Sequence, residues 1–192
     1  MDKVKLSILV CTTDSRVGNF LPVIVDELTN QAKGKPVEVL WLGDNKKRTV
    51  GEKRNNLIDI CNGEYFAFVD DDDRVAPTYI DDLLRQVNKN PDLVVFMAFR
   101  RHNGKNDRPV HYDISYLRDE NKESRYQRRP NHLMCWKKSK VSKVRFRGLN
   151  FGEDGDWSER VINHCDIKVQ KKINKILYYY DFNVKTTETQ NF

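Results

Sequence analysis

Four consecutive aspartates, Asp70, Asp71, Asp72 and Asp73, come directly after the apolar run 65–69 (YFAFV). Their like charges repel one another unless a cation lies among them. Hard divalent ions such as Mg²⁺ and Mn²⁺ prefer carboxylate and phosphate oxygens as ligands. The sequence therefore predicts a divalent-metal site in this acidic turn. The alternative is a solvated turn that caps the helix after it.

Other metal and nucleotide motifs do not fit this sequence. Counted from Asp70, an EF-hand loop needs Gly and Glu where the chain has Val75 and Asp81. The sequence has no GxGxxG after its first apolar run and no GxxxxGK[ST] at all, which disfavours dinucleotide and P-loop sites. A zinc set is also disfavoured, because adjacent helical side chains point about 100° apart and would not converge on one ion. That set would be His132, Cys135, His164 and Cys165.

A second acidic pair, Glu153 and Asp154, precedes a helical stripe of Trp157, Val161 and Cys165. Carboxylates at this position favour a helix N-terminus through the helix dipole. A carboxylate can also accept a proton from a reacting hydroxyl group. The two roles are compatible in the same residues.

The elements that position these acids alternate between strands and helices. Apolar runs at 5–11, 37–42, 65–69 and 93–99 predict strands buried on both faces. Apolar stripes at 20–32, about 50–61 and 77–87 predict the intervening helices, with Asn62-Gly63 as the stop of the second. This order predicts an α/β fold with a mixed, mainly parallel sheet and helices on both faces. Ligands bind beyond the carboxyl ends of such strands, where the polar segments 12–14, 43–45 and 70–73 follow.

The second half of the chain has a weaker pattern. Residues 100–130 predict loops or short antiparallel strands, 132–136 a returning strand, 138–144 a short helix or turn, and 176–182 a last strand. The residues after 182 are expected to fray. With no repeat or linker in the sequence, we expect one domain over 1–192.

Composition restricts the class of protein. Of the 192 residues, 39% are hydrophobic and 32% are charged, which is typical of a globular domain. No apolar run approaches the roughly 20 residues of a membrane-spanning helix, and the N-terminus lacks a signal-peptide pattern. The four cysteines are far apart and predict free thiols in a reducing compartment. We therefore expect a cytoplasmic location.

Three motifs, in this order, resemble glycosyltransferase family 2, whose enzymes have the GT-A fold. The segment 7–14 (SILVCTTD) is similar to the opening strand of that family, and 51–55 (GEKRN) with 63–73 (GEYFAFVDDDD) to its helix–strand–DxD segment. Residues 152–154 (GED) resemble its Glu-Asp motif. The chain departs from the family pattern at Cys11, where many members have proline, and at 43–45, which retains one aspartate. Residues 100–131 match no family pattern.

The resemblance implies an inverting, metal-dependent transfer of a sugar from a nucleoside diphosphate, most simply a UDP-sugar, to an acceptor hydroxyl. It implies Mn²⁺ or Mg²⁺ as cofactor, with Asp72 as direct ligand, supported by Asp70. Asp154 is implied as the general base, with Glu153 supporting its orientation. The implied nucleotide-sugar contacts are Thr12, Asp14, Asp44, Arg54, Asn55, Asp70 and Asp71. We expect donor binding in residues 1–99, and acceptor binding and the base in 100–192.

The acceptor is the least determined part of this hypothesis. Residues 97–147 hold 15 Lys or Arg and 5 Asp or Glu, a net +10 in a chain of +6. With interleaved aromatic residues, this pattern is compatible with an anionic polymer, and a hydroxylated DNA base is the first acceptor hypothesis. A saccharide, free or lipid-linked, is the alternative, and a non-catalytic nucleotide- or nucleic-acid-binding module is a third. His132 and Trp157 are weak acceptor candidates, since a structural histidine and a core tryptophan are the plainer interpretations.

Overall fold

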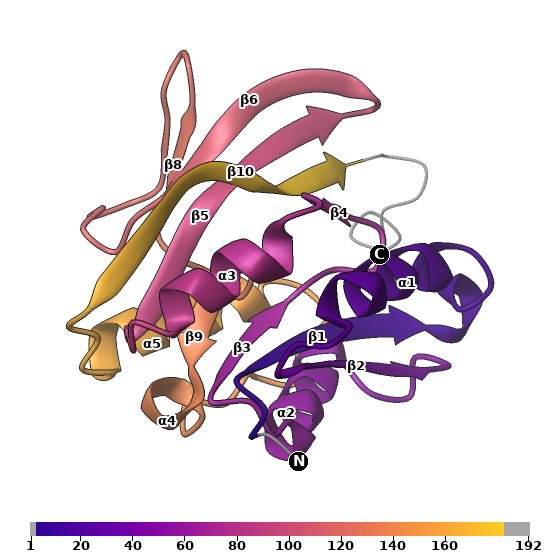
Figure 1. The fold of residues 1–192 in the computed structure, drawn as a ribbon. Coiled ribbons are helices and arrows are strands. Elements are labelled where there is room, and N and C mark those ends of the chain that lie inside the picture. Colours follow the sequence, from indigo (N-terminus) through magenta and orange to yellow (C-terminus); the bar gives the residue numbers. More distant parts are fainter. Residues whose placement is uncertain (1–2, 183–192) are drawn as a thin grey trace.

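The computed structural model describes residues 3–182, and the predicted fraying after 182 lies outside this range. The first half alternates as predicted, from β1 (Leu6–Thr13) through α1 (Phe20–Ala32), β2 (Val37–Asp44), α2 (Val50–Ile60) and β3 (Tyr65–Phe68) to α3 (Tyr79–Val87) and β5 (Leu93–His102). β2, β1 and β3 pair in parallel. One face of the sheet carries α1 against α3, and the other carries α2 against α5 (Glu153–His164) (Figure 1). The predicted fold class is confirmed.

The second half extends the sheet further than the sequence predicts. β9 (Cys135–Lys137) lies antiparallel between β3 and β5. β10 (Gln170–Phe182) runs parallel to β5 and pairs with the short β4 (Arg74–Val75). β6 (Lys105–Tyr112) forms a long hairpin with β5, followed by β8 (Tyr126–Arg128) and β7 (Glu120–Asn121) (Figure 1).

Two strand boundaries predicted from the sequence were wrong. The returning strand begins at Cys135 rather than His132, because 131–134 form a turn in which Met134 N donates to Asn131 O. The predicted short helix or turn at 138–144 is the helix α4 (Lys138–Val141) followed by a turn. The last strand begins six residues earlier, at Gln170, because its polar first half pairs with β5 along its backbone.

Gly63 has a different role from the predicted helix stop. α2 ends at Ile60, and Gly63 does not adopt the positive φ of a helix-terminating glycine. A Cβ at this position would overlap the Ser7 hydroxyl, and Gly63 N donates to that hydroxyl at 2.9 Å. Glycine is therefore required here by the close approach of β1.

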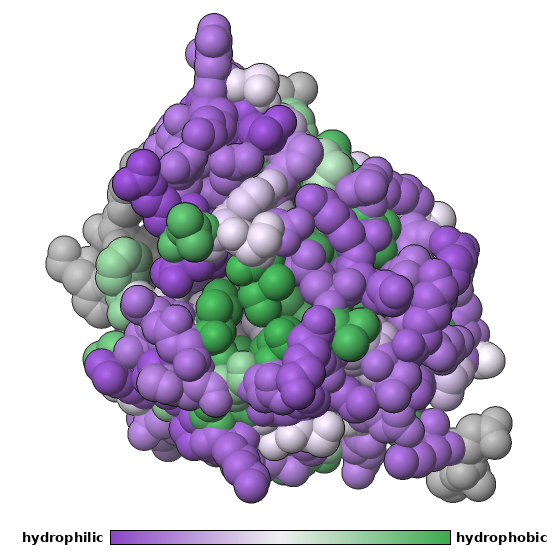
Figure 2. All heavy atoms as spheres, turned by 90° about the vertical axis from the view of Figure 1, so that its left-hand side faces the viewer, coloured by the Kyte–Doolittle hydropathy of each residue, from purple (hydrophilic) through white to green (hydrophobic). Residues whose placement is uncertain are grey.

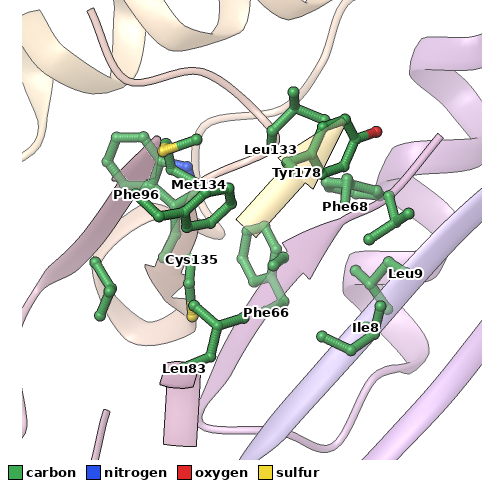
Figure 3. Close-up of a cluster of buried hydrophobic side chains, with 14 of the residues drawn as sticks. Ile8, Leu9, Phe66, Phe68, Leu83, Phe96, Leu133, Met134, Cys135 and Tyr178 are labelled. Carbon is green, nitrogen blue, oxygen red and sulfur yellow. The ribbon is translucent and has the colours of Figure 1, made fainter. Parts of the chain in front are cut away.

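The core fills the space between the sheet and its helices. Figure 3 shows aromatic residues of β3 and β5, Phe66, Phe68 and Phe96, gathered with Met134, Cys135 and Tyr178. Each of these side chains is at most 1% exposed. Burial on this scale contributes about 1.5–3 kcal/mol for each large side chain. The four cysteines are free, and no helix among residues 3–182 is long and apolar enough to cross a membrane.

Asp113 ties the end of β6 to the start of β10. Its carboxylate accepts hydrogen bonds from Ser115 N, Ser115 Oγ, Gln170 Nε2 and Lys172 Nζ at 2.9–3.2 Å. Burial raises the pKa of Asp113, but these donors outweigh it and lower the pKa from 3.8 to about 2. The ionised form is thus favoured in the folded state.

We expect Asp113→Asn to lower the free energy of unfolding by on the order of 1–2 kcal/mol near neutral pH. Because the folded pKa lies below the unfolded one, this stabilisation is present above about pH 4 and is lost as the pH falls toward 2. Urea titrations of wild type and variant at pH 7 and pH 3 should show the difference shrinking with acid. Asp166→Asn is the matched control, since its carboxylate is 67% exposed. A difference that is equal at both pH values would contradict this assignment.

Candidate active site

The carboxyl ends of β1 and β3 open into a cavity of about 430 Å³. Its lining includes eight of the residues predicted from the sequence: Thr12, Arg54, Asp70, Asp71, Asp72, His132, Glu153 and Asp154. The acidic turn and the predicted base thus face one cavity, although 80 or more residues separate them in the chain.

The four aspartates of the acidic turn have different surroundings. Asp70 lies 3.3 Å from Arg54 Nη2 and 3.4 Å from His132 Nε2. Asp71 accepts a hydrogen bond from Thr12 Oγ1 at 2.6 Å. Asp72 keeps a side chain that is 25% exposed in the cavity. Asp73 is buried, accepts from Tyr178 Oη at 2.7 Å and from Asp181 N at 3.0 Å, and caps no helix.

Arg16, which the sequence did not single out, neutralises part of this turn. It comes from the short helix η1 (Asp14–Arg16) and reaches Asp71 at 2.5 Å and Asp72 at 3.0 Å. Burial raises the pKa of Asp71 and Asp72, and Arg16 opposes the rise in both. For Asp72, the charges of Asp70 and Asp71 add to the rise.

Two buried cations of α2 link neighbouring segments of the site. Lys53 contacts β1 and β2, and Arg54 contacts the acidic turn and α5. Lys53 Nζ donates to Thr12 O at 2.7 Å and lies 3.1 Å from Asp44 Oδ1. Arg54 Nη1 donates to Glu153 at 2.5 Å, and its guanidinium packs against the rings of Phe68 and Phe146. A capping box of Thr49 and Glu52 begins this helix. The capped first turn of α2 therefore fixes the positions of Lys53 and Arg54.

His132 lies between the two acidic groups. Its Nε2 is 3.4 Å from Asp70 Oδ2 and its Nδ1 is 3.4 Å from Asp154 Oδ2. Burial and Arg54 lower the pKa of His132, but Asp70 and Asp154 outweigh them and raise it above its usual value. Burial likewise raises the pKa of Asp154, and His132 and Arg54 reverse this and lower it strongly. Asp154 is therefore ionised at neutral pH, with a side chain that is 38% exposed.

The loop before α5 is held by the start of α2. Gly51 N donates to Leu149 O at 3.1 Å, and Val50 N donates to Asn150 Oδ1 at 3.1 Å. Two N-terminal amides of α2 thus find their acceptors in the loop that leads to Asp154. A Cβ on Gly51 would overlap the carbonyl oxygen of Arg147, so glycine permits this contact.

The structure places four predicted residues outside the cavity lining. Asp14 begins η1, and Asp44 is paired with Arg48 and Lys53. The Asn55 amide bonds the backbone of Phe146 in both directions, at 2.8 and 2.9 Å. Trp157 is 0% exposed and stacks on Phe146 with 4.6 Å between ring centroids. Its ring offers no face to a sugar, so the weak acceptor assignment of Trp157 was wrong.

The cavity also contains residues that sequence reasoning missed. Besides Arg16 and Lys53 they include Asn131, Phe151 and Tyr180, while Tyr112 is one of the interleaved aromatic residues of the basic stretch. Lys53 lies next to Arg54 in the segment GEKRN, so the sequence did contain a signal that could have identified it as a site residue. No periodic pattern marks the others.

A divalent ion would find hard oxygen donors in this cavity. Asp70 and Asp72 carry partly exposed carboxylates, 33% and 25%, and the pKa of Asp72 is raised mainly by burial, with a smaller contribution from the charges of Asp70 and Asp71. No group of three or more His, Cys, Asp or Glu suited to hold a metal occurs within residues 3–182. Two carboxylates could supply only part of an ion's ligands, and phosphate and water oxygens would have to supply the others.

Comparisons with known proteins bear on the family and the fold of the chain. The sequence model of Glycosyl transferase family 2 matches residues 7–146. No curated protein sequence matches the chain significantly.

Solved structures of S. aureus TarS share the fold. TarS 1-349 in complex with UDP-GlcNAc has a TM-score of 0.68 and 13% identity over 98% of this chain and 61% of that one. Its complex with UDP gives 0.65 and 15% over 93% and 60%. A longer TarS structure gives 0.64 and 15% over 93% and 37%. The chain thus spans about 60% of the shorter TarS structures and 37% of the longer one.

Proposed function

Because the chain belongs to glycosyl transferase family 2, we propose that it transfers a sugar from a UDP-sugar to an acceptor hydroxyl group with inversion. One observation carries the proposal: the ionised Asp154 and the acidic turn face the same cavity, connected through His132. The TarS structures with UDP and UDP-GlcNAc support the choice of donor.

The donor side is the wall formed by β1, α2 and the acidic turn. Arg16, Lys53 and Arg54 lie along it, each paired with a carboxylate, and together with a divalent ion they would balance the charge of a diphosphate. Thr12 and Asp71 line the wall near the predicted ribose position, and Asp44, fixed by Lys53 and Arg48, lies behind it. The nucleotide contacts of Asp14 and Asn55 stay predictions. Asn55 hydrogen-bonds the backbone of Phe146, so any effect on the nucleotide would be indirect.

The proposed divalent ion, Mn²⁺ or Mg²⁺, is held by Asp72, with Asp70 as a second carboxylate. When bound, such an ion supplies Lewis-acid stabilisation of the negative charge on the departing diphosphate. Arg16 keeps Asp71 and Asp72 oriented toward the cavity.

On the other side of the cavity, Asp154 accepts the proton of the acceptor hydroxyl. That oxygen attacks the anomeric carbon from the face opposite the diphosphate, which inverts the configuration. His132 and Arg54 hold Asp154 ionised, and Arg54 also anchors Glu153 beside it. The negative charge of a bound diphosphate would raise the pKa of Asp154 toward the range of an effective base.

Hydrolysis of UDP-sugars with and without Mn²⁺ tests this function. Water takes the place of the acceptor, so the expected result is slow, metal-stimulated release of UDP from at least one donor. The absence of turnover with every donor would favour the third hypothesis, a module that binds nucleotides without catalysis.

We expect Asp72→Asn to lower Mn²⁺-stimulated hydrolysis by about 100-fold or more, because removing one electrostatic contact to a developing charge costs about 10²–10³ in rate. Asp81→Asn, whose side chain is 52% exposed and pairs with Lys35, is the control and should match wild type. Equal metal stimulation in Asp72→Asn and wild type would remove Asp72 from the site.

A hydroxylated DNA base is a second candidate acceptor. Arg100 of β5, Arg108 of β6 and Arg128 of β8 surround the buried ring of Tyr126 at 4.3–5.5 Å, and guanidinium groups of this kind contact nucleic-acid phosphates. Affinity for duplex DNA, measured across a salt series, should fall steeply if phosphates are bound. A flat or absent response contradicts this candidate.

A further inference from the structure

The cavity has a second wall whose chemistry differs from that of the donor side. It is built by three neighbouring strands and the loop before α5. β5 supplies Ala98, β6 supplies Val110 and Tyr112, β10 supplies Tyr180, and the loop supplies Phe151. Ala98 pairs with Val110 and with Tyr178, so the period-two alternation puts these strand residues on one sheet face.

Aromatic surface is exposed at this wall. Phe151 is 68% exposed and Tyr180 is 39% exposed, while Tyr112 is 6% exposed. Exposed aromatic rings beside a cavity offer apolar contact area at a cost of only two side-chain torsions each. Figure 2 shows the left-hand side of Figure 1, where β8 and α5 lie; its surface is mostly hydrophilic, with a group of hydrophobic residues near the middle.

Lysine and arginine are absent from this wall, among the residues described as lining the cavity. The three such cations of the cavity, Arg16, Lys53 and Arg54, belong to the donor side, and each lies within 3.3 Å of a carboxylate. Arg100 follows Ala98 by two residues on β5 and lies on the same sheet face. Its side chain contacts Tyr126 and Asp107 rather than the cavity. A phosphate on the acceptor would find no cation at this wall to receive it.

Four cations of residues 97–147, against a net excess of ten positive charges, pair with acids from other segments. Lys140 pairs with Asp92, Arg145 with Asp59, Arg147 with Asp156, and Arg101 with Asp181. These pairs reduce the positive potential available for a polyanion.

Polar groups at the wall suit hydroxyl groups. Asp154 is an acceptor. Asn150 uses its Oδ1 for Val50 N, and its amide nitrogen, which makes no hydrogen bond within residues 3–182, is a donor directed to solvent or ligand. Aromatic faces combined with a few hydrogen-bonding groups bind neutral polyhydroxylated rings, whose C–H faces are apolar and whose edges are polar.

We propose that this aromatic wall binds a neutral sugar ring, so that the acceptor is a saccharide whose reacting unit carries no phosphate, with Phe151 as its stacking platform. This inference rests on the proposed transferase function and specifies its acceptor. It favours the saccharide over the DNA base.

The test uses the full chain with the UDP-sugar that it hydrolyses best. Three kinds of probe are added: neutral methyl glycosides of glucose, galactose and N-acetylglucosamine, the corresponding sugar 6-phosphates, and duplex DNA containing 5-hydroxymethylcytosine. UDP release above the rate of hydrolysis is measured. The expected result is stimulation of at least 10-fold by one or more neutral glycosides, and less than 2-fold by phosphorylated sugars and DNA.

The variant series isolates the role of Phe151. Phe151→Ala should raise the KM for the glycoside at least 10-fold relative to wild type. Phe151→Trp should keep the KM near wild type, because a ring face remains. Leu149→Ala is the matched control, since Leu149 lies in the same loop at 43% exposure, outside the cavity lining.

The failures are distinguishable. Stimulation by DNA or phosphorylated sugars alone, no stimulation by any neutral glycoside, or an unchanged KM in Phe151→Ala would overturn the inference while donor hydrolysis persists. If neither hydrolysis nor UDP binding is detected in wild type, the proposed function itself is contradicted, and the inference with it.

Discussion

Asp154→Asn is expected to lower the rate of sugar transfer by about 10²–10⁴-fold, the usual contribution of a positioned general base. An amide of the same shape cannot take the proton of the acceptor hydroxyl. The nucleotide wall is left intact, so the affinity for UDP in the presence of Mn²⁺ should stay within a few-fold of wild type. Turnover and UDP binding measured on the same preparation separate these effects.

Asp156→Asn is the matched control for this variant. Asp156 lies in the same first turn of α5, pairs with Arg147 and Arg160, and is outside the cavity lining. It should transfer sugar at nearly the wild-type rate. Equal losses in both variants would attribute the effect to the stability of α5 rather than to proton transfer.

Gly51→Ala is expected to have the second large effect. The added Cβ would overlap the carbonyl oxygen of Arg147, so the loop 147–152 would have to move away from α2. The hydrogen bonds from Gly51 N and Val50 N to this loop would then weaken. Overpacking of this kind costs about 1–3 kcal/mol, or a fall of roughly 2–12 °C in Tm for a chain of this size.

The displaced loop leads directly to Asp154, so Gly51→Ala should also lower sugar transfer at least 10-fold at temperatures where the variant is folded. Misplacement by about 1 Å can cost 10²-fold in rate. Thermal unfolding and transfer rates give the two readouts. Gly155→Ala is the control, because a Cβ there meets nothing within 4 Å, and its Tm should be equal to or above that of wild type. A wild-type Tm for Gly51→Ala would show that the loop tolerates the methyl group.

The part of the fold that the sequence predicts is the part with local, periodic apolar patterns. The stripe of Leu21, Ile24 and Leu28 is buried as α1, and the run 65–68 is fully buried as β3. The acidic turn was also predictable, because four consecutive aspartates after a buried strand repel one another unless a cation is nearby. These signals lie within a few residues of one another.

The rest depends on contacts between distant segments. β6 contains Lys105, Asp107 and Pro109, a poor strand sequence, and forms because β5 and β8 pair with its backbone. Lys53 and Arg54 are buried because Asp44, Asp70 and Glu153 come to them from other elements.

The role of His132 illustrates the same limit. Its sequence context, ahead of an apolar run, favoured a structural histidine. Only the antiparallel insertion of β9 beside β3 brings it between Asp70 and Asp154. Likewise, the sequence around Phe151 does not indicate a binding role. The ring becomes a candidate only because β5, β6 and β10 line the same cavity.

Calorimetry of UDP binding in the presence and absence of Mn²⁺ tests the central claim most directly, namely that the acidic turn holds a nucleoside diphosphate together with a divalent ion. The expected result is a heat of binding that requires Mn²⁺ and is abolished by Asp72→Asn. If wild type gives no heat with Mn²⁺ and UDP, or gives the same heat without the metal, the acidic turn does not have this role.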